Sequence, residues 1–253
     1  QSDEWTVERG APKWGKSSGR HTLQLDGQTV LKTSGADGLK CEKRFTVSFW
    51  MKPADLTDGV ILSQQQDNSR RPGLAVELSD GKIQFFLITR WVAGVAAVES
   101  VSAVDVDRWV HVTLINDGSQ SARGLTLFID GKPQLVRILY NTNSNTGGVG
   151  KSVPLRLGGG VVGRPYRGEL ADVRVYNRSL FPDEVTALSV WQTIPNILST
   201  PSGQRTLAQT AVLRRWYLEH RAPDKLKRSA ARVTNARQKL QTFVDRLPTT
   251  MVM

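Results

Sequence analysis

The sequence predicts an all-β protein, a two-sheet antiparallel sandwich, followed by a C-terminal α-helical hairpin. Between residues 21 and 176, apolar runs of about 5 to 8 residues are bounded by Gly, Asp, Asn and Pro, which is the spacing of short paired strands. After residue 204 the apolar residues recur at helical spacing. The charge changes at the same place, because residues 205–253 carry +8 of the net charge of +11. These patterns predict a domain boundary shortly before residue 207.

Ten strands are expected in the first part of the chain. Asp-Gly pairs at 80–81, 117–118 and 130–131 mark tight turns, because glycine accepts the positive φ that such turns require. Alternation of apolar residues, as in Leu125, Leu127 and Ile129, indicates strands with one buried face, and two stacked sheets would bury those faces. The expected strands are 21–25, 45–52, 60–64, 73–78, 82–88, 96–101, 109–115, 124–129, 155–157 and 168–176.

Three helices are expected after the last strand. Pro182 and the two acids that follow it begin a short helix over 182–191. Helical spacing predicts a second helix over 207–220, and Pro223 separates it from a third. The third helix has a coiled-coil-like seam with 4-3 spacing, which predicts an antiparallel hairpin whose small area needs a partner surface. The seam consists of Leu226, Ala230, Val233, Leu240, Val244 and Leu247, with Arg237 as the exception.

The expected organisation is a sandwich domain over 1–194, a linker over 195–206 and a basic helical hairpin over 207–253 that leads to a following domain. Because the chain begins at Gln1 without an initiator Met or an apolar leader, it is interpreted as a mature or excised piece. The one cysteine, Cys41, excludes an internal disulfide framework and a cysteine-rich zinc site within these residues.

Six motifs between residues 10 and 190 form a recognisable series. They are LQLDG at 23–27, FTVSFWMKP at 45–53, WVHV at 109–112, DG at 117–118, LFIDG at 127–131 and GELADVRVYNRSL at 168–180. This series resembles the bacterial laminin G-like family, whose domains are concanavalin A-like lectin jelly rolls. The resemblance implies a jelly-roll sandwich and an extracytoplasmic location, either periplasmic or at the cell surface. The C-terminal segment is similar to a linker in large planctomycete-type surface proteins with cytochrome c-like neighbours, which implies a multi-domain fragment.

The acidic residues do not predict an enzyme, although jelly rolls of this type also include glycoside hydrolases. Retaining hydrolysis needs two carboxyls about 5 to 5.5 Å apart, which on one strand means acids two or four residues apart. Asp105 and Asp107 have that spacing, but they precede a strand and are expected to be solvated loop acids. His111 is expected to be a packed core histidine and Cys41 an inert thiol, so no catalytic residue is assigned.

Calcium is the cofactor that the resemblance raises. In the family, an aspartate of the final strand often supplies a carboxylate to a structural calcium ion, and Ala171 occupies that position here. Asp172 follows, but a shift of one residue along a strand turns a side chain to the opposite face. Asp26 and Asp172 could still supply oxygen ligands. We expect no calcium site of the conserved type, and no other cofactor is assigned.

Three expected loops carry residue types that bind sugars, because aromatic rings pack on the apolar faces of pyranoses and planar polar groups bind their hydroxyls. An equally good interpretation is that their Asn and Gly satisfy turn geometry while their aromatic residues cover the core edge. Trp50 and Trp109 lie inside strand motifs and are expected in the core. The candidate sugar-binding residues are Arg90, Trp91, Tyr140, Asn141, Asn143, Arg164 and Tyr166.

The leading hypothesis is a non-catalytic module that binds polysaccharide. The alternative is a structural module that packs against neighbouring domains of its own protein and has no glycan ligand. The basic charges lie along amphipathic helices without interleaved aromatic residues or a known reading motif, which favours an acidic domain or an anionic polysaccharide over nucleic acid. No apolar run reaches the length of a membrane span, and the seam is too narrow to favour a membrane surface.

Overall fold

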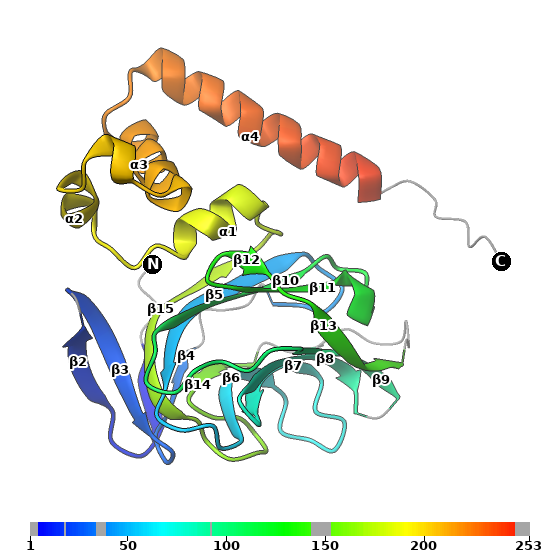
Figure 1. The fold of residues 1–253 in the computed structure, drawn as a ribbon. Coiled ribbons are helices and arrows are strands. Elements are labelled where there is room, and N and C mark those ends of the chain that lie inside the picture. The colour runs from blue at the N-terminus through cyan, green and yellow to red at the C-terminus, as the bar shows by residue number, and fades with distance from the viewer. Residues whose placement is uncertain (1–4, 18, 34–38, 92, 143–152, 246–253) are drawn as a thin grey trace. The chain divides into compact units, whose positions relative to one another are not determined.

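A computed structural model describes residues 5–17, 19–33, 39–91, 93–142 and 153–245. The chain divides into two compact units, residues 1–191 and 192–253. The first unit consists of two stacked antiparallel sheets and the second is helical, as Figure 1 shows. The predicted all-β sandwich with a C-terminal helical region is therefore confirmed. The sequence placed the end of the sandwich domain at residue 194, close to the end of the first unit.

The two sheets contain the ten expected strands and five further ones. The further strands, β1, β2, β4, β12 and β13, are short or lie near the sheet margins. One sheet has eight strands in the order β1 (Thr6–Arg9), β4 (Val30–Thr33), β14 (Leu155–Leu157), β6 (Gly59–Gln65), β7 (Gly73–Ser79), β8 (Lys82–Arg90), β9 (Gly94–Ser100) and β13 (Val136–Thr142). The other has seven in the order β12 (Lys132–Pro133), β11 (Leu125–Ile129), β10 (Val110–Asn116), β5 (Phe45–Pro53), β15 (Arg167–Tyr176), β3 (Arg20–Asp26) and β2 (Lys13–Ser17).

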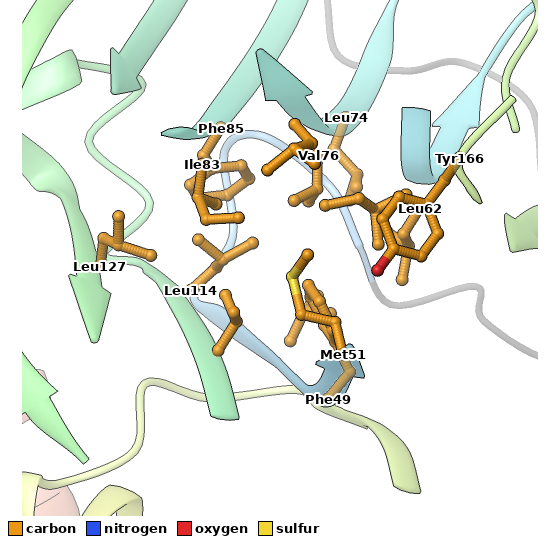
Figure 2. Close-up of a cluster of buried hydrophobic side chains, with 14 of the residues drawn as sticks. Phe49, Met51, Leu62, Leu74, Val76, Ile83, Phe85, Leu114, Leu127 and Tyr166 are labelled. Atoms are coloured by element: carbon orange, nitrogen blue, oxygen red, sulfur yellow. The ribbon is translucent and has the colours of Figure 1, made fainter. Parts of the chain in front are cut away.

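The hydrophobic core lies between the sheets. Alternate residues of each strand point inward, so Phe49 and Met51 of β5 meet Val76 of β7 and Phe85 of β8 (Figure 2). These four side chains are at most 1% exposed. Burial of this kind stabilises a sandwich by about 25 cal/mol for each Å² of apolar surface removed from water.

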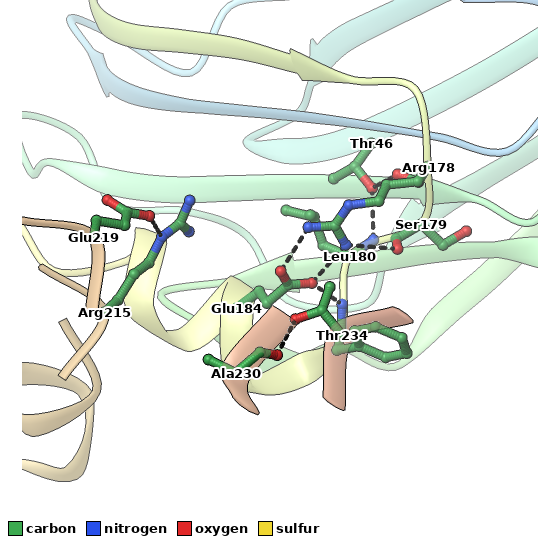
Figure 3. Close-up of polar contacts among 10 residues, drawn as sticks. Thr46, Arg178, Ser179, Leu180, Glu184, Arg215, Glu219, Ala230 and Thr234 are labelled. Atoms are coloured by element: carbon green, nitrogen blue, oxygen red, sulfur yellow. Dashed lines mark hydrogen bonds and ion pairs between the residues drawn. The ribbon is translucent and has the colours of Figure 1, made fainter. Parts of the chain in front are cut away.

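Helix α1 (Pro182–Leu188) covers part of the outer face of the seven-stranded sheet. Its Val185 packs with Leu180 against Ile115 of β10 and Phe128 of β11. At the helix start, Glu184 binds the guanidinium of Arg178 at 2.6 and 2.7 Å and accepts from the Phe181 N–H at 2.9 Å (Figure 3 shows the ion pair). The helix ends at Leu188, three residues before the predicted end at 191.

The last residue of the first unit, Trp191, belongs to an aromatic cluster on the outer side of the seven-stranded sheet. The Trp191 ring stacks on Trp109 at a centroid distance of 4.7 Å and meets Trp50 edge-on at 4.8 Å. The guanidinium of Arg20 lies 5.0 Å from the Trp191 ring and donates to the Val190 and Trp191 carbonyls at 3.0 and 2.8 Å. Trp50 is buried, as predicted, but Trp109 is only half-buried, and both belong to this cluster and not to the core between the sheets. The cluster joins Trp191 to β3, to β5 and to the residue that precedes β10.

The second unit contains α2 (Ile194–Leu198), α3 (Leu207–His220) and α4 (Asp224–Asp245), with a 3-10 turn at Ser202–Gln204. The two long helices agree with the predicted ones. The seam residues of α4 are exposed, with Leu226, Val233 and Leu240 at 48%, 55% and 64%, so the seam is not packed as the predicted antiparallel hairpin required. Among the described residues, the helices are too short or too polar to cross a bilayer.

Candidate functional site

The outer face of the eight-stranded sheet carries a second, smaller apolar cluster. It consists of Ala75, Phe86, Ile88, Val95 and Ala97 on β7, β8 and β9. These residues alternate with core residues of the same strands, so they point away from the core. Trp91 and Leu139 pack against the cluster from its two sides. Where no sheet is named, "the outer face" below means this surface of the eight-stranded sheet.

The β8–β9 turn places Trp91 at one end of the outer face. Its ring is half-buried, and the guanidinium of Arg71 lies 4.0 Å from the ring centroid. The Trp91 N–H donates to the Arg70 carbonyl at 2.7 Å, which joins this turn to the β6–β7 connection. Arg90 precedes Trp91 at the end of β8 and is exposed. The predicted position of Arg90 and Trp91 at a strand end is therefore correct.

Tyr140 lies on the outer face, because it is directly opposite Ala97, which in turn is opposite Phe86. The Tyr140 side chain is 48% exposed, whereas Phe86 is 8% exposed. Tyr140 and Asn141 were expected in a loop, and this was wrong, since both belong to strand β13. A polar, exposed edge strand lacks the apolar alternation by which a strand is recognised in a sequence.

A row of polar side chains crosses the outer face beside the apolar cluster. Glu77, Gln84, Glu99 and Arg137 stand in register on β7, β8, β9 and β13. Gln84 Nε2 donates to Glu99 at 2.7 Å, and Arg137 donates to the same carboxylate at 2.7 Å. Lys82 approaches it at 3.8 Å. Planar groups held in this way present a fixed hydrogen-bonding edge next to aromatic rings.

The two carboxylates of this row have opposite pKa shifts. Burial raises the pKa of Glu77 above its ordinary value. Burial acts on Glu99 in the same direction, but hydrogen bonds from Gln84 and the charge of Arg137 outweigh it and hold the Glu99 pKa below its ordinary value. Their Cα atoms are two strands, about 10 Å, apart. Because the Glu99 oxygens are occupied by donors, the row suits hydrogen bonding better than retaining hydrolysis.

The polar row was not predicted from the sequence, because paired acids were expected two or four residues apart on a single strand. The residues are 7, 15 and 38 positions apart in the sequence and meet only through strand register. The available signal was the Asp80-Gly81 turn, which fixes the pairing of β7 with β8 and sets Glu77 opposite Gln84.

Asn141 does not join the outer face as a sugar ligand. The Asn141 Oδ1 accepts from the Ala122 N–H at 2.9 Å and the Ser121 hydroxyl at 3.2 Å, so this side chain closes the short 3-10 turn at Ala122–Gly124. Asn141 therefore stabilises a turn, which is the interpretation that the sequence allowed as the alternative to sugar binding. Asn143 lies outside the described residues.

Arg164 and Tyr166 lie on the connection between β14 and β15, away from Trp91 and Tyr140. Arg164 is exposed, and its carbonyl accepts from the Val60 N–H at 2.7 Å. The assignment of Tyr166 as a sugar-binding residue was wrong, because its side chain is 1% exposed and belongs to the main core (Figure 2). The Tyr166 N–H donates to the Gly158 carbonyl at 3.0 Å, which holds the ring inward.

The proposed calcium ligands do not form a common site. Asp26 and Arg20 are at opposite ends of β3, about 20 Å apart, and Arg20 pairs with Asp172. Arg174 also binds Asp172, at 2.8 Å, so two positive charges occupy its oxygens and oppose a bound cation. Asp26 accepts from the backbone N–H groups of Gln28 and Thr29 at 2.9 Å, which lowers its pKa. Within the described residues, no three metal-ligating side chains cluster.

Cys41 is buried in the main core between the sheets, whereas His111 is buried on the outer side of the seven-stranded sheet, beside Ser48 and Trp50. The His111 Nε2 lies 2.9 Å from the Ser48 hydroxyl, and burial lowers the pKa of the imidazole to about 3. Burial also raises the pKa of the Cys41 thiol to about 12. Neither group carries charge near neutral pH or meets solvent, in agreement with their expected structural roles.

Comparison with known proteins adds the family context. Residues 25–186 match a family model described as the concanavalin A-like lectin/glucanases superfamily. A curated relative, the adhesion G-protein coupled receptor V1 of Danio rerio, is 29% identical over 153 residues. The match covers 57% of this chain and 2% of the receptor, so the chain corresponds to a small part of that protein.

Solved structures with a similar fold include a domain of an arabinanase and the binding domain of a neurotoxin. Domain 4 of AbnA, an extracellular GH43 arabinanase from Geobacillus stearothermophilus in complex with arabinotriose, matches with a TM-score of 0.56 and 18% identity, over 74% of this chain and 88% of that chain. The binding domain of botulinum neurotoxin serotype G matches with a TM-score of 0.55 and 13% identity, over 74% of this chain and 46% of that chain. At these identities the likeness is one of fold.

Proposed function

Since the chain belongs to the concanavalin A-like lectin/glucanases superfamily, we propose that its sandwich is a non-catalytic module that binds polysaccharide through the outer face. The module would work outside the cytoplasm, as part of a larger protein. The arabinanase domain of similar fold, solved with arabinotriose, supports an oligosaccharide as the kind of ligand.

The observation that carries the proposal is the arrangement of Phe86 and Tyr140 next to the polar row. The two rings stand on one face of the sheet, and Gln84, Glu99 and Arg137 lie one step along the same strands. A sugar ring has an apolar C–H face and a rim of hydroxyls, so it needs these two kinds of surface side by side. The outer face of the seven-stranded sheet offers less room, because α1 and Trp191 pack on it.

The test is the binding of the full chain to a panel of neutral and acidic polysaccharides, measured by affinity gel electrophoresis and calorimetry. We expect Tyr140→Ala to weaken binding about tenfold or more, because it removes an exposed ring that packs on sugar. Leu135→Ala is the matched control, since Leu135 is 82% exposed and precedes the same strand. Unaltered circular dichroism in both variants separates binding from folding. Equal affinity of the two variants, or no binding by the parent chain, would contradict the proposal.

A second candidate function is a structural one, and the exposed seam of α4 favours it. Leu226, Val233 and Leu240 recur every seven residues on a helix that also carries basic side chains. Under this alternative the second unit packs against an acidic neighbouring domain, and the sandwich has no glycan ligand. The same panel distinguishes the two functions, because a purely structural module would leave every polysaccharide unbound.

A further inference from the structure

Two neighbouring segments at the Trp91 end of the outer face carry three arginines. Arg70 and Arg71 lie on the β6–β7 connection and Arg90 lies at the end of β8. The two segments are joined by the hydrogen bond from the Trp91 N–H to the Arg70 carbonyl at 2.7 Å. We call Arg70, Arg71 and Arg90 the arginine cluster.

The β6–β7 connection holds its arginines in a defined conformation. The Asn68 Oδ1 accepts from the N–H groups of both Arg70 and Arg71 at 3.0 Å. Arg71 adopts a left-handed φ of 45°, and its guanidinium stacks on Trp91 at 4.0 Å. The connection returns to the sheet at Gly73, where any Cβ would lie 1.9 Å from the Gln64 carbonyl oxygen. The backbone around the cluster is therefore fixed by local contacts.

The arginine cluster differs from most other arginines of the sandwich in its charge balance. Seven other arginines of the first unit pair with carboxylates, as in Arg156 with Glu8 at 2.8 Å and Arg108 with Asp130 at 2.7 Å. Arg70, Arg71 and Arg90 form no ion pair with any carboxylate in the described part of the chain. Asp67 shares their connection, and Glu77 lies close enough for its pKa to respond to Arg71. Arg90 lies four residues, about 13 Å, from Phe86 along β8, so the cluster holds an excess of positive charge on the same strand as an aromatic residue of the outer face.

Unpaired guanidiniums next to an aromatic ring suit an anionic ligand. A guanidinium is planar, always charged, and binds carboxylate or sulfate oxygens through two parallel hydrogen bonds. Stacking on Trp91 holds the plane of Arg71 without using its N–H donors.

We propose that the outer face selects acidic polysaccharides, whose carboxylate or sulfate groups bind the arginine cluster while neighbouring sugar rings pack on Tyr140. This inference rests on the proposed function of the outer face and adds the charge class of its ligand.

The experiment compares three ligands: polygalacturonate, which carries carboxylates, dextran sulfate, which carries sulfates, and a neutral galactan. We expect the full chain to bind at least one acidic polysaccharide about tenfold more tightly than the galactan at an ionic strength of about 0.15 M. The triple variant Arg70→Gln, Arg71→Gln and Arg90→Gln should lose that preference. Which acidic polymer is preferred identifies the group that the cluster binds.

The basic second unit requires a matched control, because it could attract any polyanion. The triple variant Arg228→Gln, Arg232→Gln and Lys239→Gln removes three positive charges from α4 and leaves the arginine cluster unchanged. This variant should still prefer acidic over neutral polysaccharide. Loss of the preference in this control but not in the cluster variant would overturn the inference. A double variant, Arg70→Gln with Arg90→Gln, retains the Arg71–Trp91 stack and should lose most of the preference if the cluster variant fails to fold.

The outcomes also separate this inference from the function on which it rests. Equal affinity for neutral and acidic polysaccharides, with loss of both in Tyr140→Ala, would overturn charge selection and leave polysaccharide binding intact. Absence of binding to all three polymers would overturn both. Arg71→Lys keeps the positive charge but replaces the planar guanidinium with an ammonium group. We therefore expect this variant to bind the acidic polymer more weakly than the parent chain.

Discussion

At the scale of single residues, the buried imidazole of His111 makes the sandwich sensitive to acid. His111 is 1% exposed, and its folded pKa of about 3 lies far below the ordinary histidine value of 6.5. The unfolded chain therefore binds a proton in a pH range where the folded chain does not. The stability contributed by the neutral form is complete above pH 6.5 and is lost as the pH falls towards 3.

We expect the free energy of unfolding to fall by up to about 1.4 kcal/mol for each pH unit below 6.5 on account of His111. Urea unfolding between pH 7 and pH 5 measures this slope before most carboxylates titrate. His111→Gln offers a neutral hydrogen-bonding group to Ser48, so its slope should be smaller. An unchanged slope in this variant would show that other groups cause the acid sensitivity.

The sequence identified some residues of the outer face and not others, for physical reasons. Trp91 was selected because an aromatic residue at a strand end, three positions before Gly94, has a local signature. Tyr166 has the same local signature, yet it is buried, because its direction depends on how residues 165–166 lie beside β6. The Glu77, Gln84 and Glu99 row arises from strand register, which no single segment of sequence contains.

At the scale of elements, the strands that the sequence predicted have a buried face, although the four-residue β4 is also buried and was missed because it is so short. β5, β6 and β10 are almost entirely buried and were expected within one or two residues of their ends. β1 and β13 are mainly exposed edge strands, and they were missed because an edge strand needs little apolar surface. The motif series that predicted the jelly roll lies mainly in the buried strands, which explains why the fold could be predicted while the outer face could not.

The start of α1 depends on Glu184, which joins the helix to the end of β15. Its carboxylate accepts from the Phe181 N–H and from two nitrogens of Arg178. We expect Glu184→Ala to lower the free energy of unfolding by about 1 to 2 kcal/mol, the usual cost of losing a helix cap. Denaturant titration followed by circular dichroism measures it.

Glu184→Gln provides the matched control, because the amide oxygen can still accept from the Phe181 N–H. We expect it to cost less than half as much as the alanine variant. Equal losses would mean that the charge pair with Arg178, and not the cap, holds the helix.

At the scale of the whole molecule, the chain passes from the first unit to the second between Trp191 and Gln192. The contacts of Trp191 with Trp50, Trp109 and Arg20 belong to the first unit. We expect a fragment of residues 1–191 to unfold cooperatively with the stability of the sandwich in the full chain.

A fragment of residues 1–190 lacks only Trp191 by comparison, so it tests this cluster directly. We expect it to be less stable than residues 1–191 by about 1 to 3 kcal/mol, because stacking, edge contact and the Arg20 interaction are lost together. Thermal unfolding of the two fragments measures the difference. Equal stability would show that Trp191 adds nothing to the sandwich.

The Trp191 cluster also determines how the sandwich would carry mechanical load. Tension applied at the helical end of the chain arrives first at Trp191, whose ring and carbonyl are fastened to residues of β5 and β3 and to Trp109 just before β10. The force is thereby shared among three strands of one sheet before α1 and the end of β15 can peel away. We therefore expect the sandwich to stay folded at pulling forces that already unfold the helices beyond Trp191.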